Sequence, residues 1–422
     1  MYTADSANCN YFGLAAGFFD SRVEPDPKDR SLSRPRAYLD HNATSPLRPA
    51  ARAAMLAVLT QAGNASSVHR EGRRARAEIE AARESLARLV KTQPKNVYFT
   101  SGATEALNLA LTPELELDGN KTPFDVLFVS AGEHAGVLQG HRFPATAVEK
   151  LPLTTAGVLD LAALDAALAR HAGQRVLLAL QAANNETGVV QPVAEAAARV
   201  HAAGGALVCD AVQAAGKAAC DFAALGADIL VLSAHKIGGP QGAGALCFAN
   251  GRHHIADTIV RGGGQERGLR AGTENVAAIA GFAAAVEGVA EGGASEIARL
   301  ARLRDRLERD VLVSAPDVVS FGANVARLPN TANFAVPGVG AEVLLMALDL
   351  EGVAVSSGSA CSSGKVKRSH VLEAMGVPSA LAEGAIRVSL GWSSEEDDVD
   401  MFRIAFAKAV ETIRSKRVKP AA

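Results

Sequence analysis

Several patterns that would place this sequence in a special class of protein are missing from it. Its five cysteines are scattered, with no CxxC pair and no zinc-binding spacing, and their odd number does not suit a secreted disulfide framework. Basic and acidic residues nearly balance, 43 against 45, so no charge excess points to a nucleic-acid partner. These absences indicate a soluble globular protein of the reducing cytoplasm, without direct nucleic-acid binding.

Long hydrophobic runs are missing as well. The most apolar stretch near the N-terminus, Tyr11–Phe19, is shorter than the roughly 20 residues that cross a bilayer. No basic segment precedes it, and acidic residues lie on both sides, which argues against a targeting peptide. We therefore expect no membrane association and interpret residues 1–36 as a poorly ordered extension.

The sequence instead alternates short apolar runs with amphipathic helical segments. Strands are predicted for seven runs, at Val97–Gly102, Asp125–Ser130, Val148–Leu153, Arg175–Ala183, Ala206–Ala211, Asp228–His235 and Gly244–Asn250. Several are apolar at successive positions, as in strands buried on both faces. Helical periodicity between them predicts helices at Glu71–Val90, Asp160–Ala172 and Pro192–Gly204. This alternation indicates an α/β fold with a mostly parallel sheet of about seven strands.

The pattern changes after Asn275. Two helical stretches, the second of them charged, are followed by a mixture of strands and helices that is typical of a smaller α+β domain. The length of 422 residues suits such a division. We expect a cofactor-binding large domain over residues 51–290 and a small domain over residues 291–422, with residues 37–50 associated with the small domain.

In an open α/β sheet, ligands bind beyond the carboxyl ends of the strands. Chemically active residues follow the predicted strands here, in the segments SGAT, GEH, NNETG, DAVQ and SAHK. A lone lysine such as Lys236 in SAHK is ordinarily an exposed surface residue. A Schiff-base lysine would instead need phosphate donors nearby and a carboxylate for a pyridinium nitrogen.

Groups of both kinds are present. Asp210 ends an apolar strand, where a buried carboxylate needs a partner such as a protonated pyridine nitrogen. Ala103 and Thr104 begin a helix whose free N–H groups and dipole favour a phosphate. Ser233 and His235 add a hydroxyl and an imidazole. Together these signals predict a site for pyridoxal 5'-phosphate.

Two further residues fit the same pocket. Gln213 can donate a hydrogen bond to the hydroxyl of the pyridine ring. His134 in GEHAG is placed to stack on an aromatic ring, although a single histidine in such a position is more often a hydrogen-bonded structural residue.

Nine motifs occur along the chain in the order YLDHNATSPL, SGATEALNLAL, EHAGVLQ, ANNETGVVQP, CDAVQAAGK, SAHKIGGPQGAGAL, GGGQERGLRAGTENV, SSGSACSSG and AIRVSLG. Over roughly Tyr38–Trp392 the sequence thereby closely resembles the NifS/IscS-like cysteine desulfurases, class V aminotransferase-family enzymes on the fold-type-I scaffold of pyridoxal-phosphate proteins. The resemblance implies removal of sulfur from L-cysteine, with L-alanine as product. The sulfur would pass as a persulfide to acceptor proteins, for iron–sulfur cluster assembly or other sulfur trafficking.

The resemblance also implies roles around the cofactor. Lys236 would hold it as a Schiff base, Asp210 would pair with the ring nitrogen, and His134 would stack on the ring and act as acid or base. The O3' side of the ring would be bound by Asn185 and Gln213. The phosphate would be held by Thr104, Ser233 and His235. Thr273 of RAGTEN would reach the phosphate of the neighbouring subunit, which implies a homodimer.

Three residues are expected at the substrate. Arg387 in AIRVSLG would bind the substrate carboxylate, a role that suits a planar guanidinium, and the alternative for it is a surface salt bridge. Asn185 would lie at the substrate as well as at the cofactor. Asn42 in DHNATS is explained equally well as a turn residue and as a substrate contact.

Cys361 lies in SSGSACSSGKVKRSH, a Gly/Ser-rich stretch that suits neither a helix nor a core. As a thiolate it would accept the sulfur, and its tether would let one thiol serve both the pocket and a large acceptor protein. The alternative for a cysteine is a small buried apolar residue, which fits Cys209, Cys220 and Cys247 better. No permanent metal site is expected, although the resemblance allows the Cys361 persulfide to bind a nascent iron–sulfur cluster transiently.

The sequence departs from many members of this branch after Cys361. They continue with a Leu-Glu-Pro-Ser-His-like stretch, whereas this chain has three cations, Lys365, Lys367 and Arg368. These would favour the thiolate of Cys361, and our hypothesis is that they also meet an acidic patch on the sulfur acceptor. A solvated run of charge is the alternative.

Two other kinds of function compete with this one. A selenocysteine lyase or another class V pyridoxal-phosphate enzyme would share the scaffold, but an aminotransferase needs no loop thiol. A non-catalytic scaffold for iron–sulfur assembly would not need the intact set of Lys236, Asp210, His134, Arg387 and Cys361.

Overall fold

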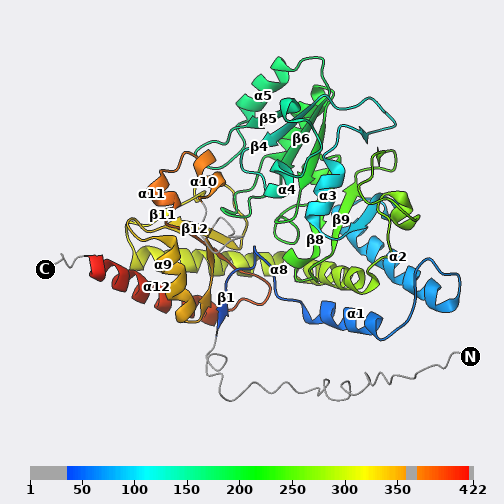
Figure 1. Cartoon of the computed structure of the whole chain (residues 1–422). Coiled ribbons are helices and arrows are strands. Elements are labelled where there is room, and N and C mark those ends of the chain that lie inside the picture. The colour runs from blue at the N-terminus through cyan, green and yellow to red at the C-terminus, as the bar shows by residue number, and fades with distance from the viewer. Residues whose placement is uncertain (1–35, 358–367, 418–422) are drawn as a thin grey trace, which may run out of the picture. The chain divides into compact units, whose positions relative to one another are not determined.

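The computed structural model describes residues 36–357 and 368–417 (Figure 1). The predictions for the N-terminal extension, and those for Cys361, Lys365 and Lys367, fall outside these residues.

A seven-stranded sheet forms the centre of the larger part of the molecule. Its strands lie in the spatial order β2 (Val97–Thr100), β9 (Gly244–Phe248), β8 (Ile229–Ser233), β7 (Ala206–Asp210), β6 (Val176–Gln181), β4 (Val126–Ser130) and β5 (Val148–Leu151). Neighbouring strands are parallel except at β9, which runs antiparallel to both β2 and β8. The predicted α/β fold and its mostly parallel sheet are thus confirmed, and each strand is somewhat shorter than predicted.

Both faces of this sheet are covered, which explains the continuous apolar runs. In β6, Leu178 packs into a core on one face and Leu177 into a core on the other. The first face carries the helices α2 (Arg70–Val90), α5 (Leu161–Arg170) and α6 (Val193–Ala202). The second carries α3 (Ala103–Ala110) and α4 (Ala135–Leu138). The three helices predicted between the strands correspond to α2, α5 and α6.

The C-terminal part has a core of its own around a four-stranded antiparallel sheet. The strands are β11 (Val319–Ser320), β12 (Thr331–Ala335), β15 (Ala385–Ser389) and β14 (Ser356–Ser357), in that order. Four helices accompany them, α9 (Ala341–Leu350), α10 (His370–Ala374), α11 (Ser379–Ala382) and α12 (Glu396–Arg417). The start of the described chain joins this core, because β1 (Ala37–Tyr38) pairs in parallel with β13 (Val353–Ala354).

One long helix, α8 (Val276–Ser314), belongs to both cores (Figure 1). Phe282 packs into the core of the large sheet, and Leu307 packs into the core of the small sheet. Between them, Gly293 leaves helical geometry with φ 42° and ψ −141°, so α8 consists of two helical stretches, as the sequence predicted, which meet at this residue. In length and composition α8 could cross a membrane, but these buried contacts are those of a core helix.

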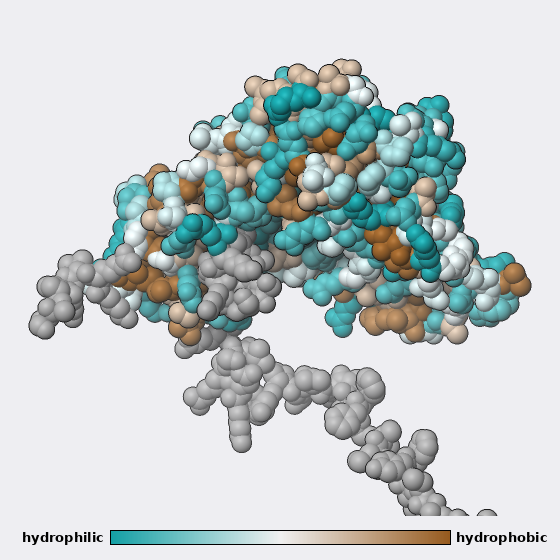
Figure 2. All heavy atoms as spheres, turned by 45° about the horizontal axis from the view of Figure 1, so that its top comes forward, coloured by the Kyte–Doolittle hydropathy of each residue, from teal (hydrophilic) through white to brown (hydrophobic). Residues whose placement is uncertain are grey.

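Helix α1 (Pro49–Leu59), which packs on α8, was not predicted from the sequence. Only Ala51 of this Ala-rich helix is buried, and Leu56 and Leu59 are exposed, so no clear apolar stripe marks it. In the view of Figure 2, hydrophobic residues lie in separate groups among hydrophilic ones. Besides α1, exposed large apolar residues include Met346 and Leu350 of α9.

A buried ion pair fixes the loop that carries Thr273 to the edge of the large sheet. The guanidinium of Arg83, on α2, donates to both carboxylate oxygens of Glu266 at 2.8 and 2.9 Å and to the carbonyl of Val97 at 2.6 Å. Glu266 and Arg267 have left-handed backbones, with φ of 45° and 54°. Such conformations are unfavourable for residues other than glycine, so the ion pair holds a strained turn in place.

We expect that Glu266→Gln, which leaves the buried Arg83 cation with only the partly exposed Glu80 as an ionic partner, will lower the free energy of unfolding by about 3–5 kcal/mol. The matched control is Arg88→Met, which removes the exposed ion pair with Glu287 and should cost less than about 1 kcal/mol. Urea unfolding monitored by circular dichroism measures both. Equal changes in the two variants would contradict this view of the buried pair.

Candidate active site

A cavity of about 600 Å³ opens beyond the carboxyl ends of the strands of the large sheet. Strands β6, β7 and β8 end there with Gln181, Asp210 and Ser233, all of which line it. Every site residue predicted from the sequence lines this cavity, apart from Thr273 and the undescribed Cys361. The parallel strands therefore bring together residues that are far apart in the sequence.

Lys236 lies in the single turn that follows β8. Its amine donates to the carbonyls of Asn42 at 2.6 Å and Ala43 at 2.8 Å. Burial, with the positive charge of Arg387 nearby, lowers the pKa of Lys236 from 10.5 to about 8, although Asp210 opposes the shift. A half-buried lysine whose amine is readily deprotonated is suited to act as a nucleophile or a base.

Asp210 and Gln213 form the side of the cavity at β7. Burial raises the pKa of Asp210, while the amide of Val212, His134 and Lys236 act in the opposite direction. Its Oδ1 accepts from Val212 N at 3.0 Å. Gln213 donates through Nε2 to the carbonyl of Asn42, and its buried Oε1 has no partner within the described chain. The site thus presents a buried carboxylate and an unused amide oxygen.

His134 is the N-cap residue of α4, and its Nδ1 accepts from the amide of Gly136 at 3.0 Å. Because Nδ1 is an acceptor, the neutral ring carries its proton on Nε2. Burial lowers the pKa of His134, with Lys236 and His370 adding to the shift and Asp210 opposing it. The ring is therefore neutral near pH 7 and holds its proton at a defined atom.

The N-terminus of α3 forms another wall. Within the described chain no side chain caps this end, so its first N–H groups are available. A Cβ on Gly244 would come within 2.5 to 2.9 Å of the backbone at Gly102 and Ala103, so only glycine allows this close packing. Thr104 lies in this first turn and lines the cavity. These donors suit a phosphate.

Ser233 and His235 line the cavity on the β8 side. The Nδ1 of His235 lies 3.2 Å from Oγ1 of Thr44. Burial lowers the pKa of His235 to about 4, with Lys236 and Lys217 contributing, so this imidazole is neutral near pH 7. It can therefore take part as a hydrogen-bonding group rather than as a cation.

Arg387, on β15 of the small sheet, reaches the same cavity from the other core. It is not the surface residue of the alternative interpretation, because it is 4% exposed. Its Nη2 pairs with Asp40 at 2.7 Å, and its Nη1 donates to the carbonyl of Asn185 at 3.0 Å. Each terminal nitrogen carries two N–H groups, so one on each remains for a carboxylate ligand.

Asn42 and Asn185 are used differently. The amide of Asn42 is engaged at both ends, donating to Thr331 at 2.9 Å and accepting from Asn330 at 3.0 Å. It therefore joins the cavity wall to the small sheet, and its contact with a substrate stays a prediction. The side chain of Asn185 makes no hydrogen bond within the described residues and lines the cavity.

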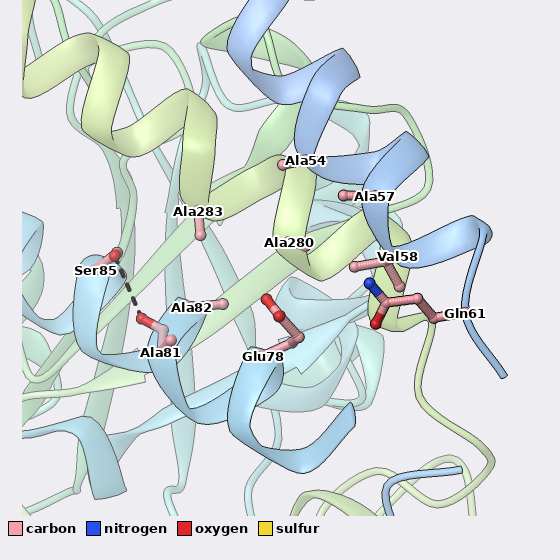
Figure 3. Close-up of a pocket in the computed structure, with 10 residues that line it drawn as sticks. All are labelled: Ala54, Ala57, Val58, Gln61, Glu78, Ala81, Ala82, Ser85, Ala280 and Ala283. Carbon is pink, nitrogen blue, oxygen red and sulfur yellow. Dashed lines mark hydrogen bonds between the residues drawn. The ribbon is translucent and has the colours of Figure 1, made fainter. Parts of the chain in front are cut away.

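Thr273 lies beside this cavity. It is exposed and borders a separate hollow of about 190 Å³, which shares Ser101 and Gly242 with the main cavity. A third hollow, also of about 190 Å³, lies between α1, α2 and α8 and is lined mainly by alanines, with Gln61, Glu78 and Ser85 as its polar residues (Figure 3). This third hollow holds none of the predicted site residues.

Three residues of this site were not singled out from the sequence. Asp40 holds Arg387, and Glu105 forms an ion pair with Arg270 at 3.0 Å beside the N-terminus of α3. Glu133 is fully buried next to His134, and burial, with Asp210 nearby, raises its pKa well above the ordinary value. All three stand inside the quoted motifs, but their partners are set by tertiary contacts.

The three cysteines of the described residues lie where the sequence predicts them. Cys209, Cys220 and Cys247 are buried free thiols, and burial raises the pKa of each. They are therefore poor nucleophiles. Arg368, the described member of the three cations, is exposed and pairs with Glu383 at 3.2 Å.

Comparison with known proteins agrees with this geometry. The class V aminotransferase family matches residues 37–402. The chain is 41% identical over 370 residues to an IscS-like cysteine desulfurase of Mycobacterium tuberculosis, covering 86% of this chain and 93% of that protein. It is 40% identical over 386 residues to a cysteine desulfurase of Cereibacter sphaeroides, covering 90% and 97%. A solved NifS-like protein of Rickettsia africae matches with a TM-score of 0.80 at 32% identity, covering 89% of this chain and 100% of that one. The chain therefore belongs to the class V aminotransferase family, among its IscS- and NifS-like cysteine desulfurases.

Proposed function

We propose that this protein is a pyridoxal-phosphate-dependent cysteine desulfurase that moves the sulfur of L-cysteine onto Cys361 and releases L-alanine. One observation carries the proposal: a half-buried lysine with a pKa of about 8 shares a cavity with a buried carboxylate, a neutral histidine and an arginine. The persulfide would then pass to an acceptor protein, in iron–sulfur cluster assembly or other sulfur trafficking.

The residues present fit the cofactor. Pyridoxal phosphate would be held by a lysine until the amine of the substrate takes the lysine's place, and it would then withdraw electrons from the carbon next to the substrate nitrogen. Lys236 would hold it covalently, and Asp210 would keep a proton on the ring nitrogen. The partnerless Oε1 of Gln213 and the free amide of Asn185 would bind the ring hydroxyl. The open N-terminus of α3 with Thr104, together with Ser233 and His235, would hold the phosphate.

The chain's own groups would bind the substrate and move its protons. Arg387 has one N–H left on each terminal nitrogen for the carboxylate of L-cysteine, and Asp40 keeps the guanidinium in place. Lys236, once its amine is neutral, can take the proton from the α-carbon. His134 holds a proton on Nε2 and can exchange it with the substrate.

Sulfur transfer would occur at Cys361. Its thiolate forms an S–S bond to the substrate sulfur while the bond between that sulfur and the β-carbon breaks. The electron pair stays with the β-carbon, which takes up a proton and becomes the methyl group of alanine. Cys361 follows Ser357 by four residues, a span of at most about 14 Å, and Ser356 lines the cavity. The thiol is therefore within reach of the site.

We further propose a homodimer in which Thr273 completes the neighbouring site, supported by its exposed position beside its own cavity. The sulfur acceptor would present an acidic patch to Lys365, Lys367 and Arg368. The ion pair of Arg368 with Glu383 is exposed and therefore weak, so it leaves this cation available. The buried free thiols favour a reducing, cytoplasmic location.

We expect Cys361→Ser to lose alanine formation from L-cysteine by at least about 100-fold, because the nucleophile is missing. Its cofactor absorbance, and the change in absorbance on adding L-cysteine, should remain. Mass spectrometry of the wild-type protein should find one added sulfur on the peptide of Cys361. Cys9→Ser is the matched control and should behave as wild type. Sulfur on another thiol, or undiminished alanine formation by Cys361→Ser, would contradict the proposal.

The lowered pKa of Lys236 predicts how fast apoprotein takes up pyridoxal phosphate at different pH. The amine reacts only when neutral, so the rate should rise with pH and reach half its plateau near pH 8. The growth of visible absorbance after mixing measures it between pH 6 and pH 10. N-acetyl-lysine, with an ordinary pKa of about 10.4, is the control. Its reaction rate should still be rising at pH 10, with no plateau in the measured range. A protein profile matching this control would show that the cavity does not lower the pKa.

A further inference from the structure

Ser369, the N-cap residue of α10, binds the loop that follows β6. Its hydroxyl accepts from the amide of Leu372 at 3.1 Å and forms a buried hydrogen bond with a carboxyl oxygen of Glu186. Glu186 follows Asn185 directly, and its backbone carbonyl accepts from the side-chain amide of Asn333 at 3.1 Å. The start of α10 is thus hydrogen-bonded one residue away from a side chain that lines the cavity.

His370 binds the loop that follows β4. Its Nε2 lies 2.9 Å from the carbonyl of Glu133, and because a carbonyl only accepts, the imidazole donates. Glu133 directly precedes His134. Its Oε1 accepts from the amide of Gln181 at 2.9 Å, which fixes this loop to the end of β6. Ser369 and His370, here called the anchor, therefore connect α10 to two separate walls of the cavity.

Apolar packing holds α10 independently of the anchor. Val371, Leu372 and Met375 are buried in a cluster with Leu153 and Phe321. Burial of this kind is not directional, so it keeps the helix in place without fixing the exact position of its first turn. The two anchor hydrogen bonds supply that direction. Their loss would leave the buried carboxyl of Glu186 without its hydroxyl partner. Because an unpaired buried polar group is unfavourable, the hydrogen bonds of the anchor are strongly favoured over their absence.

The other end of the segment that carries Cys361 is also fixed at the cavity. Strand β14 pairs with β15, with Ser356 opposite Arg387 in the register. Ser357, just before the segment, belongs to β14, which pairs with β15. Arg368, just after it, directly precedes Ser369 of the anchor. On the side after Cys361 the attachment to the cavity wall is therefore the anchor.

We propose that Ser369 and His370 are positioning residues for sulfur transfer, which fix the chain after Cys361 relative to His134 and Asn185. This inference rests on the proposed function, because it concerns the step in which the Cys361 thiolate meets the substrate sulfur. It assigns no contact with substrate or cofactor to either residue. The anchor acts by determining where the segment that carries the thiol leaves the cavity wall.

The test uses the holoenzyme with Ser369→Ala and His370→Leu. Cysteine binding is followed by the change in cofactor absorbance, and the first turnover by quenched mass spectrometry of the Cys361 persulfide. Cysteine affinity should stay within about twofold, while persulfide formation slows by roughly 10- to 100-fold, as expected for a displaced reacting group. His370→Gln, which restores a donor near Nε2, and Ser369→Thr, which keeps the hydroxyl, should recover most of the rate.

Val371→Ala is the control for stability. It weakens the apolar packing of α10, so it should lower the thermal midpoint and leave persulfide formation near the wild-type rate. If Ser369→Ala does not fold, the comparison of His370→Leu with His370→Gln makes the same test. Unchanged persulfide rates in the anchor variants, or equal slowing in Val371→Ala, would overturn the inference. Absence of a persulfide on Cys361 in the wild-type protein would instead overturn the proposed function.

Discussion

The electrostatic balance between a buried carboxylate and a half-buried amine at neighbouring strand ends is the constraint on which the site depends. Asp210 ends β7 and Lys236 follows β8, and burial penalises the charge of each. Each lowers that penalty for the other, since opposite charges in a poorly solvated cavity attract strongly. The result is an amine that deprotonates more easily than a surface lysine, next to a carboxylate in need of a cationic partner.

Other residues of the cavity keep this balance from being disturbed. Glu133 lies beside His134, and burial, with Asp210 nearby, raises its pKa, which disfavours a second negative charge next to Asp210. His134 remains neutral for the same reason of burial. Asp40 pairs with Arg387, which limits the positive charge that Lys236 meets. The cavity is therefore polar, but few of its groups carry an uncompensated charge.

Much of this could be predicted from the sequence. The seven strands of the large sheet were found because strands buried on both faces have continuous apolar runs. The residues of the cavity were found because parallel strands bring their carboxyl ends to one edge. Helix α1 was not predicted, because alanines on an exposed helix leave no apolar stripe. The two helical stretches of α8 were predicted separately, and they meet at the non-helical residue Gly293.

Pairings between distant residues could not be predicted in the same way. Asp40 and Arg387 lie 347 positions apart, and the bond of His370 to Glu133 joins residues separated by 237. Nothing in the local sequence of either residue specifies its partner, because both pairings depend on how the small core packs against the large one. Short motifs therefore identified the chemically active residues, whereas the residues that hold them in place could be identified only from the three-dimensional structure.

The break in α8 at Gly293 has a consequence for how a ligand is held. Lys236 belongs to the core of the large sheet and Arg387 to the small one, and α8 passes from one core to the other through this single residue. An amino acid bound by its amine end and its carboxylate end would bridge the two bodies. A change in backbone angle at Gly293 would therefore alter the distance between Lys236 and Arg387, and with it the fit of a ligand bound at both ends.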